Sequence, residues 1–404
     1  VGGVRRSALI SLSNLSDDRM RHAKSGQWWV DEGHRALANN SACYTEKPDI
    51  GIFMDEWKAL YDSKSGERGI FNRESANKMA MNNGRRIVEG YEFGTNPCSE
   101  IILRSRQFCN LSEVVVRASD NKETLLEKVR LATILGTFQS TLVNFRYVSS
   151  AWRKNCEEER LLGVSLTGIM DCEYTNGRKG ALKVLLEELK AEAVRTNKEF
   201  AEKIGINQSV AVTCVKPSGT VSQLVDAASG IHARHNPFYT RTVRGDKKDP
   251  LTKMMTDMGF PVEDDVMNPS HTSVFSFPIK VEKGAIFRTD MDAIEQLEMW
   301  LTYQKYWCEH KPSVTITVKE PEWMEVGAWV YKHFDYMSGI SFLPFSDHAY
   351  KQAPYQDTTE EEYNALVAKM PTNIDWSKLA EYEKTDMTVG SQELACSAGG
   401  CEIL

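Results

Sequence analysis

The sequence predicts an α/β protein built on a largely parallel sheet or barrel. Long segments with an apolar residue at every third or fourth position alternate with short runs rich in β-branched residues. This alternation is typical of parallel strands that are connected by helices. With 404 residues, 41% of them hydrophobic and 26% charged, the chain is long enough to bury a large core.

The first part of the chain contains fewer regular signals than the second. Residues 7–12 resemble a strand that leaves a Gly-rich turn, and residues 17–24 have a helical pattern. Residues 37–44 are rich in Asn and Ser, which fits a strand end with polar side chains facing a site, or an ordinary turn. Residues 122–145 carry the apolar stripe of a long helix.

The second part of the chain alternates clearly between helices and strands. A helix is predicted over residues 182–204, and Gly205 is a typical residue to end it. The segments that follow are predicted as a strand at 209–215, a helix at 293–308, a strand at 313–318, a helix at 320–334, a strand at 340–345 and a short capped helix at 359–370.

Composition narrows the class of function and the cellular location. The net charge of −7 argues against broad nucleic-acid binding, which requires clustered basic residues. No apolar run reaches the roughly 18 residues of a membrane helix, so we expect no membrane contact. Nine cysteines without a leader peptide indicate reduced thiols in the cytoplasm. Because the chain starts at Val1 and not at Met, we expect a fragment or a split-gene product.

A reactive site is predicted at the Asn-Pro-Cys-Ser-Glu segment, residues 96–100. Cys98 lies between Asn96 and Glu100, and on an extended backbone the three side chains point to one side. A thiol can exchange a hydrogen atom, a carboxylate can accept a hydroxyl proton, and an amide can hold a neighbouring oxygen. The alternative is a buried cysteine beside an Asn-Pro turn, and the segment on its own favours this alternative.

A phosphate site is predicted where the strand at 209–215 leads into Lys-Pro-Ser-Gly-Thr-Val-Ser-Gln, residues 216–223. The free amides at a helix start attract an anion, and the hydroxyls add hydrogen bonds. The residues that would bind phosphate are Ser218, Gly219, Thr220 and Ser222. An ordinary Ser/Thr helix cap is the commoner explanation for such a segment taken alone.

The C-terminal segment carries a pair of cysteines, Cys396 and Cys401, separated by small residues. Such a pair can close a small disulfide ring, so we interpret it as a redox pair. Half of a zinc site is the alternative, but the sequence has no second pair with zinc spacing to complete it.

Together the three motifs, in this order, resemble the catalytic chain of ribonucleotide reductases. The similarity is greatest to the monomeric, adenosylcobalamin-dependent (class II) ribonucleoside-triphosphate reductases. The resemblance implies the later part of a ten-stranded α/β barrel, in which two five-stranded halves surround a central finger loop near residues 96–109. It further implies a barrel portion at 1–350, a short helical extension at 351–382 and a flexible redox tail at 383–404.

The resemblance assigns a role to each site residue. Cys98 would be the thiyl radical that takes the 3'-hydrogen of the ribose, Glu100 would accept the 3'-hydroxyl proton, and Asn96 would hydrogen-bond the ribose hydroxyls. Cys109 would be one of two thiols that reduce the intermediate as the 2'-hydroxyl leaves as water. In the family the second thiol lies on an earlier strand, which would precede Val1.

The same resemblance implies a reductant and a substrate. Cys396 and Cys401 would reduce the oxidised active site again and pass on electrons from thioredoxin. The segment with Ser218, Gly219, Thr220 and Ser222 would bind the phosphates of a ribonucleoside triphosphate. Because one reducing thiol would be missing, we expect that turnover requires the N-terminal half, which could be supplied in trans.

The choice of class depends on a missing pair of tyrosines. Class I catalytic chains carry two adjacent tyrosines on a late strand as a radical relay, whereas residues 342–345 are Phe-Leu-Pro-Phe. We therefore expect adenosylcobalamin as the cofactor. His232 replaces the Glu that is common in diphosphate reductases, which favours a triphosphate substrate. The alternatives are a class I ribonucleoside-diphosphate reductase large subunit and an inactive fragment or assembly module.

Overall fold

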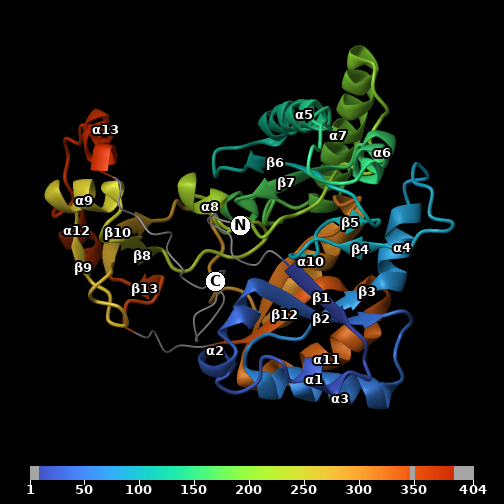
Figure 1. Cartoon of the computed structure of the whole chain (residues 1–404), viewed down its shortest axis with the longest axis horizontal. Coiled ribbons are helices and arrows are strands. Elements are labelled where there is room, and N and C mark those ends of the chain that lie inside the picture. The colour runs from blue at the N-terminus through green and yellow to red at the C-terminus, as the bar shows by residue number, and fades with distance from the viewer. Residues whose placement is uncertain (1–8, 346–350, 386–404) are drawn as a thin grey trace. The chain divides into compact units, whose positions relative to one another are not determined.

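The computed structural model describes residues 9–345 and 351–385, which form two compact units. The larger unit contains the described residues 9–233 and 284–345, and the smaller one contains 234–283 and 351–385. Figure 1 shows both units with their elements labelled. None of the helices in these described ranges is long and apolar enough to cross a membrane.

The larger unit contains a five-stranded sheet in the order β1-β2-β3-β12-β11. The first three strands are parallel, β12 runs antiparallel to β3, and β11 is parallel to β12. The bounds are β1 (Leu9–Ser13), β2 (Ala38–Tyr44), β3 (Gly69–Asn72), β11 (Val314–Val318) and β12 (Ser338–Pro344). The strands predicted at 313–318 and 340–345 are therefore confirmed.

A second parallel pair continues this arrangement. Strands β6 (Asn110–Val115) and β7 (Leu162–Thr167) are parallel neighbours, and Val164 forms a parallel bridge to Thr213. Val215 in turn forms a parallel bridge to Pro312, which precedes β11. The segment predicted as a strand at 209–215 thus joins the sheet through isolated bridges only. One group of parallel strands ends with β3 and the other with β12, and these two strands pair antiparallel, so the two groups run in opposite directions.

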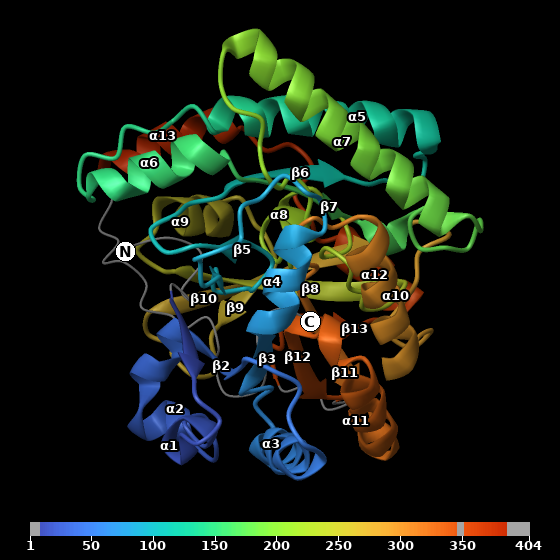
Figure 2. The same cartoon turned by 90° about the vertical axis from the view of Figure 1, so that its right-hand side faces the viewer.

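Helices cover the outer faces of these strands. Helices α5 (Lys122–Gln139) and α7 (Leu182–Ile204) pack side by side, with α5 lying over β6 and β7 (Figures 1 and 2). Helix α10 (Ala293–Tyr306) contacts α7, β11 and α11 (Trp323–Lys332), and α11 also packs on α3 (Ile50–Ser63). Trp57 of α3 donates a hydrogen bond from its indole to the Trp323 carbonyl, 3.1 Å away, and both rings are buried.

The two long predicted helices differ in how they end. Helix α7 ends at Ile204 as expected, because Gly205 adopts the left-handed conformation (φ 73°) that favours glycine. Helix α5 ends at Gln139, earlier than predicted. The hydroxyls of Ser140 and Thr141 donate to the carbonyls of Thr137 and Phe138, and these local bonds compete with continuation of the helix.

The remaining elements of the larger unit are short. They are α1 (Asp18–Arg21), α2 (Trp28–Asp31), α4 (Arg73–Met81), β4 (Gly94–Thr95), β5 (Ile102–Leu103), α6 (Ser150–Glu159), α8 (Val221–Leu224) and the 3-10 helices Gly33–Leu37, Ile169–Asp171, Glu320–Glu322 and Phe334–Tyr336.

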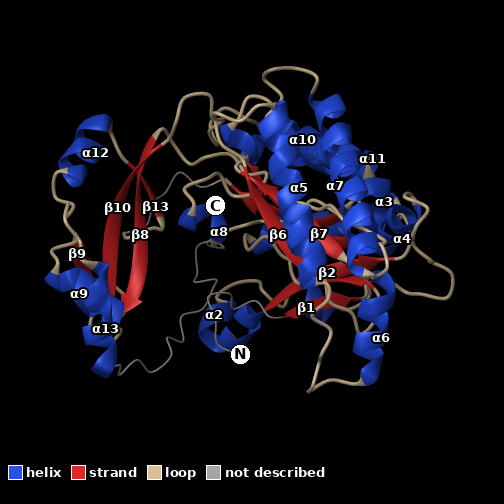
Figure 3. Cartoon of the chain, turned by 90° about the horizontal axis from the view of Figure 1, so that it is seen from above, coloured by secondary structure: helices blue, strands red, loops and turns tan. Residues whose placement is uncertain are grey.

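The smaller unit contains a four-stranded antiparallel sheet in the order β13-β8-β10-β9 (Figure 3). Its elements are β8 (Phe238–Asp246), α9 (Pro250–Asp257), β9 (Val262–Asp264), β10 (Thr272–Lys280), β13 (Tyr355–Asp357), α12 (Glu360–Val367), α13 (Leu379–Tyr382) and the 3-10 helices Trp376–Lys378 and Glu383–Thr385. The predicted capping box of α12 is present at Thr359 and Glu362. Residues 234–283 thus pack with the extension that follows residue 350, and the expected domain boundaries stay predictions.

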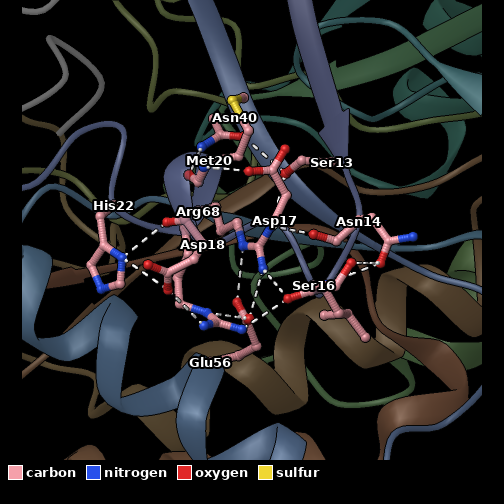
Figure 4. A network of polar contacts seen from close by, with 12 residues as sticks. Ser13, Asn14, Ser16, Asp17, Asp18, Met20, His22, Asn40, Glu56 and Arg68 are labelled. Carbon is pink, nitrogen blue, oxygen red and sulfur yellow. Dashed lines mark hydrogen bonds and ion pairs between the residues drawn. The ribbon is translucent and has the colours of Figure 1, made fainter.

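A buried charge network holds β1, α1, α3 and β3 together (Figure 4). Glu56 of α3 accepts hydrogen bonds from Arg21 at 2.7 Å and from Arg68 at 2.9 and 2.6 Å. Arg68 also donates to the Ser13 hydroxyl and the Asn14 carbonyl, both 2.9 Å away, at the end of β1. Because Glu56 and Arg68 are buried, each compensates the other's loss of hydration.

A further buried ionisable residue is Lys311, which directly precedes Pro312 and β11. Its side chain is 1% exposed, and its Nζ donates to the Ser75 hydroxyl in the first turn of α4, 2.8 Å away. Burial lowers the pKa of Lys311 to about 7. This lysine therefore loses its charge near neutral pH in the folded protein.

We expect the substitution Glu56→Gln to lower the free energy of unfolding by about 3 kcal/mol, because it leaves the buried Arg68 guanidinium without a carboxylate. The matched control is Asp62→Asn on the same helix, which removes an exposed ion pair with Lys58 and should cost about 0.5 kcal/mol or less. Urea unfolding followed by tryptophan fluorescence measures both. Equal losses in the two variants would contradict the role of the network.

We expect Lys311→Met to weaken the pH dependence of stability between pH 7 and 10. Unfolded lysine keeps its proton to its usual pKa of 10.5, whereas folded Lys311 releases it near 7. The unfolded state binds more protons in this window, so Lys311 makes the free energy of unfolding rise with pH, by up to about 1.4 kcal/mol per unit. The measurement is urea unfolding at several pH values, with exposed Lys58→Met as control. An unchanged slope would count against a neutral Lys311.

Candidate active site

The predicted reactive site lies on a narrow hairpin in the larger unit. Strands β4 (Gly94–Thr95) and β5 (Ile102–Leu103) pair antiparallel, and the turn between them carries Asn96, Cys98 and Glu100. We call residues 94–109 the finger loop. The structure thus places these three residues in one short turn. Glu100 is 1% exposed, whereas Cys98 is half-buried.

Hydrogen bonds within the turn fix its shape. The side-chain oxygen of Asn96 accepts a hydrogen bond from the Ile101 amide at 3.0 Å, and the backbone carbonyl of Asn96 accepts one from the Ser99 amide at 2.9 Å. The Thr95 hydroxyl donates to the Ile101 carbonyl, 2.9 Å away. Asn96 therefore braces the turn through its oxygen, which leaves its NH2 group as the donor for a ligand oxygen.

Two other strands hold the tip of the finger loop. From β2, the Asn39 side chain donates to the Pro97 carbonyl, 2.6 Å away. From β12, Gly339 lies so close to Ser99 that an added Cβ would be 2.7 Å from the Ser99 carbonyl oxygen. Ser99 itself adopts a left-handed backbone (φ 62°). Of the two interpretations of residues 37–44, the structure therefore supports a strand whose polar side chain faces the site.

The segment before β11 holds the next part of the finger loop. The Lys311 amide donates to the Glu100 carbonyl at 2.9 Å, and the Ile102 amide donates to the His310 ring at 3.2 Å. Arg86 donates to the Ile102 carbonyl at 2.9 Å and to Glu159 at 2.8 Å. The backbone around Glu100 is therefore held from several distant segments.

The second predicted reactive thiol, Cys109, ends the finger loop just before β6. Desolvation raises its pKa well above the usual value, the nearby Glu100 carboxylate raises it further, and Arg86 and Lys216 partly oppose this. Cys109 therefore stays protonated, which suits a thiol that delivers hydrogen and electrons. Because Cys109 responds to both Glu100 and Lys216, it lies near the start of the predicted phosphate segment as well as near the finger turn.

The predicted phosphate segment forms a strained turn followed by a single helical turn, α8 (Val221–Leu224). Ser218 has a left-handed backbone (φ 56°), and its buried hydroxyl has no hydrogen-bond partner among the described residues. Thr220 precedes α8, but its side chain makes no capping bond. The Ser222 hydroxyl is paired with that of Ser229, 2.8 Å away. Gly219, between Ser218 and Thr220, has no side chain to cover the backbone, so a ligand could reach its amide and the neighbouring Thr220 hydroxyl.

Sequence reasoning missed several residues that shape the site, and it named two cysteines that the structure does not describe. The missed residues that hold the finger loop are Arg86, His310, Lys311 and Gly339, whereas Asn39 lies in the segment 37–44, for which polar side chains facing a site were one of two interpretations. No short motif marks the missed residues, because each reaches the finger loop across the fold from a segment distant in the chain. The tail cysteines Cys396 and Cys401 lie outside the described residues.

Comparison with known proteins gives relatives along the whole chain, although no family model matches it. An adenosylcobalamin-dependent ribonucleoside-triphosphate reductase of Lactobacillus acidophilus is 26% identical over 442 residues, covering 100% of this chain and 57% of the relative. A protein of the same name from Euglena gracilis is 28% identical, covering 99% and 54%. The chain thus spans about half the length of these curated relatives.

Solved structures show the same fold. A B12-dependent (class II) ribonucleotide reductase superposes with a TM-score of 0.72 at 22% identity, over 94% of this chain and 56% of that one. The α subunit of the class Id ribonucleotide reductase of Actinobacillus ureae gives a TM-score of 0.54 at 14% identity, over 83% of this chain and 70% of that one. The predicted resemblance is therefore confirmed: this chain is similar along its length to part of the adenosylcobalamin-dependent ribonucleoside-triphosphate reductases and has the fold of a portion of the α/β barrel of ribonucleotide reductase catalytic chains.

Proposed function

We propose that the chain is the later part of an enzyme that reduces ribonucleoside triphosphates to 2'-deoxyribonucleoside triphosphates by a thiyl-radical mechanism. The observation that carries this proposal is the finger-loop turn between β4 and β5, which carries both the half-buried Cys98 and the buried Glu100. The names of the relatives along the whole chain support the same activity.

In the proposed reaction the finger-loop turn activates the ribose. The Cys98 thiyl radical takes the 3'-hydrogen, while Glu100 accepts the proton of the 3'-hydroxyl. The Asn96 NH2 group donates to a ribose oxygen, because the other end of this amide is fixed by the Ile101 amide. Burial of Glu100 excludes water, so its interactions with the substrate are stronger than they would be in solution.

Cys109 supplies part of the two-electron reduction in this proposal. As the protonated 2'-hydroxyl leaves as water, Cys109 and a second thiol deliver two electrons and become a disulfide, and Cys98 returns the hydrogen to C3'. The raised pKa of Cys109 fits this role, because a protonated thiol carries the hydrogen that must be transferred. The second thiol, as the family resemblance implies, comes from a part of the enzyme outside this chain.

The phosphate groups of the substrate are proposed to bind at residues 218–222. The partnerless buried hydroxyl of Ser218 supports this assignment, since a buried polar group without a partner is costly unless a ligand satisfies it. Gly219 and Thr220 add backbone amides and a hydroxyl, and Ser222 fixes the turn through Ser229. His232 is consistent with the triphosphate form of the substrate.

Adenosylcobalamin is the proposed cofactor, and when bound it supplies the radical chemistry that converts the Cys98 thiol into a thiyl radical. The strand β12, which approaches the finger turn, fits a radical that comes from a cofactor. Gly339 of β12 touches the finger turn, and further along β12 the side chains are Phe342 and Leu343, both buried. A relay through protein side chains would need phenol hydroxyls, which this strand lacks.

The proposal extends to the reductant and to the rest of the enzyme. Cys396 and Cys401 would reduce the active-site disulfide and exchange with thioredoxin in the cytoplasm. Because the chain spans about 57% of the length of its relatives, we propose that turnover needs the remaining part, within a longer chain or in trans. A class I diphosphate reductase remains the second candidate, and the assay below separates the two by cofactor and substrate.

We expect CTP reduction with adenosylcobalamin and dithiothreitol when the chain is completed by the missing part of a relative, and we expect Cys98→Ala to lower it by at least about 100-fold. The matched control, Cys43→Ala, removes a half-buried thiol on β2 and should keep most of the activity. Activity with CDP and a metal-containing subunit in place of CTP and cobalamin would favour the class I alternative. Full activity of Cys98→Ala would refute the proposal.

We expect Cys109→Ser to separate the two halves of the reaction. This variant keeps Cys98 and Glu100, so Cys98 should still take tritium from 3'-tritiated CTP, and because the reduction is blocked, the label held on its thiol should exchange into water. Formation of deoxynucleotide should fall by about 100-fold or more. Scintillation counting of water and chromatography of the nucleotides measure the two quantities. Loss of tritium release together with deoxynucleotide formation would assign Cys109 to the first step and contradict the proposed division of roles.

A further inference from the structure

The imidazole of His310 connects the finger loop to the barrel. His310 is 0% exposed, and its Nδ1 accepts a hydrogen bond from the Ile102 amide of β5 at 3.2 Å. Its Nε2 donates to the Leu162 carbonyl, the first residue of β7, at 2.9 Å. One ring therefore joins the returning strand of the finger hairpin to a barrel strand far away in the sequence.

These two bonds require the neutral ring with its hydrogen on Nε2. Burial and the nearby Arg86 guanidinium lower the pKa of His310 to about 3, so the ring stays neutral across the physiological range. With Nδ1 as an acceptor, the ring satisfies the Ile102 amide, whose residue is buried and whose hydrogen bond therefore cannot be replaced by one to bulk water.

The backbone that carries His310 is itself fixed on the opposite side. The His310 amide donates to the Thr213 carbonyl at 2.9 Å, and the Thr213 hydroxyl donates to the Trp307 carbonyl at 2.6 Å. The next residue, Lys311, donates its amide to the Glu100 carbonyl. His310 and Lys311 thus bind the backbone on both sides of Ile101: the His310 ring accepts from the Ile102 amide, and the Lys311 amide donates to the Glu100 carbonyl.

We propose that His310 is a positioning residue that fixes the finger-loop turn relative to the barrel strands and so places Glu100 and Cys98 for reaction. The expected effect on kcat rests on the proposed function, whereas the expected effect on the finger-loop backbone does not. The β4-β5 hairpin has only two paired residues on each strand, so its own ladder is too short to fix the turn. Contacts from the barrel must supply the rest.

A pair of substitutions separates the two bonds of the ring. Asn carries an oxygen at the place of Nδ1, so His310→Asn keeps the acceptor for Ile102 and loses the bond to Leu162. Gln carries an NH2 group near the place of Nε2, so His310→Gln keeps the donor to Leu162 and loses the acceptor for Ile102. Each variant loses one hydrogen bond, so a general structural role predicts similar effects of both on the finger loop.

We expect the two variants to differ in amide hydrogen exchange of the peptide 96–103, measured by mass spectrometry on the full chain. Exchange should rise about tenfold in His310→Gln and stay within about twofold of the unchanged protein in His310→Asn. Urea midpoints of the two variants should be similar. In the completed enzyme, His310→Gln should lower kcat by about tenfold with little change in KM, and His310→Asn should retain most of kcat.

The matched control is His232→Gln. His232 is also bonded to backbone through both ring nitrogens, donating to the Ser229 carbonyl at 2.8 Å and accepting from the Thr315 amide at 3.1 Å. In the part of the chain that the structure describes, His232 makes no hydrogen bond to the finger loop, so its substitution should leave exchange of the peptide 96–103 unchanged.

Equal finger-loop exchange in His310→Asn and His310→Gln would overturn the inference, as would unchanged exchange in both. If His310→Gln does not fold, His310→Ala takes its place, because it also lacks the acceptor for Ile102: a tenfold higher exchange in His310→Ala than in His310→Asn supports the positioning role, and equal exchange in the two overturns it. The exchange result does not depend on turnover. A completed enzyme without CTP reduction would therefore refute the proposed function while the exchange data still test the role of His310.

Discussion

The hydrogen bonds between the finger loop and distant backbone segments are the constraint on which the site depends. The turn at residues 96–101 is partly buried, so its carbonyls and amides need partners inside the protein. Asn39 binds the Pro97 carbonyl, the Lys311 amide binds the Glu100 carbonyl, and His310 binds the Ile102 amide. Asn39 on β2 and the segment before β11 thus hold one loop from both groups of parallel strands, and with it the positions of Cys98 and Glu100.

Burial also sets the chemical character of the site. Desolvation and the Glu100 carboxylate keep Cys109 protonated, and desolvation keeps the Cys214 thiol protonated as well, since both pKa values lie well above the usual range. Protonated Cys109 and Cys214 thiols near the buried Glu100 are better suited to hydrogen-atom and electron transfer than to thiolate attack or metal binding. The geometry and the electrostatics therefore support the same class of reaction.

Much of the regular structure could be predicted from local sequence. The apolar stripe of α7 and the glycine that ends it, the capping box of α12 and the β-branched runs of β11 and β12 follow from propensities that act over a few residues. The end of α5 was predicted too late, because Ser140 and Thr141 bond to their own preceding carbonyls. The antiparallel unit around β8 and β10 was not predicted; β8 and β10 lie between β7 and β11 in the chain, and β8 also pairs with β13, which follows β12.

The sequence by itself determined the grouping of Asn96, Cys98 and Glu100, because residues at alternate positions of a short turn stay close whatever surrounds them. It also indicated the resemblance to ribonucleotide reductases through the order of its motifs. Only the tertiary structure decided which residues hold that group: Asn39, His310 and Gly339 come from segments far apart in the chain. Their contacts are single hydrogen bonds or close backbone approaches, and such contacts leave no periodic or local pattern in the sequence from which they could be recognised.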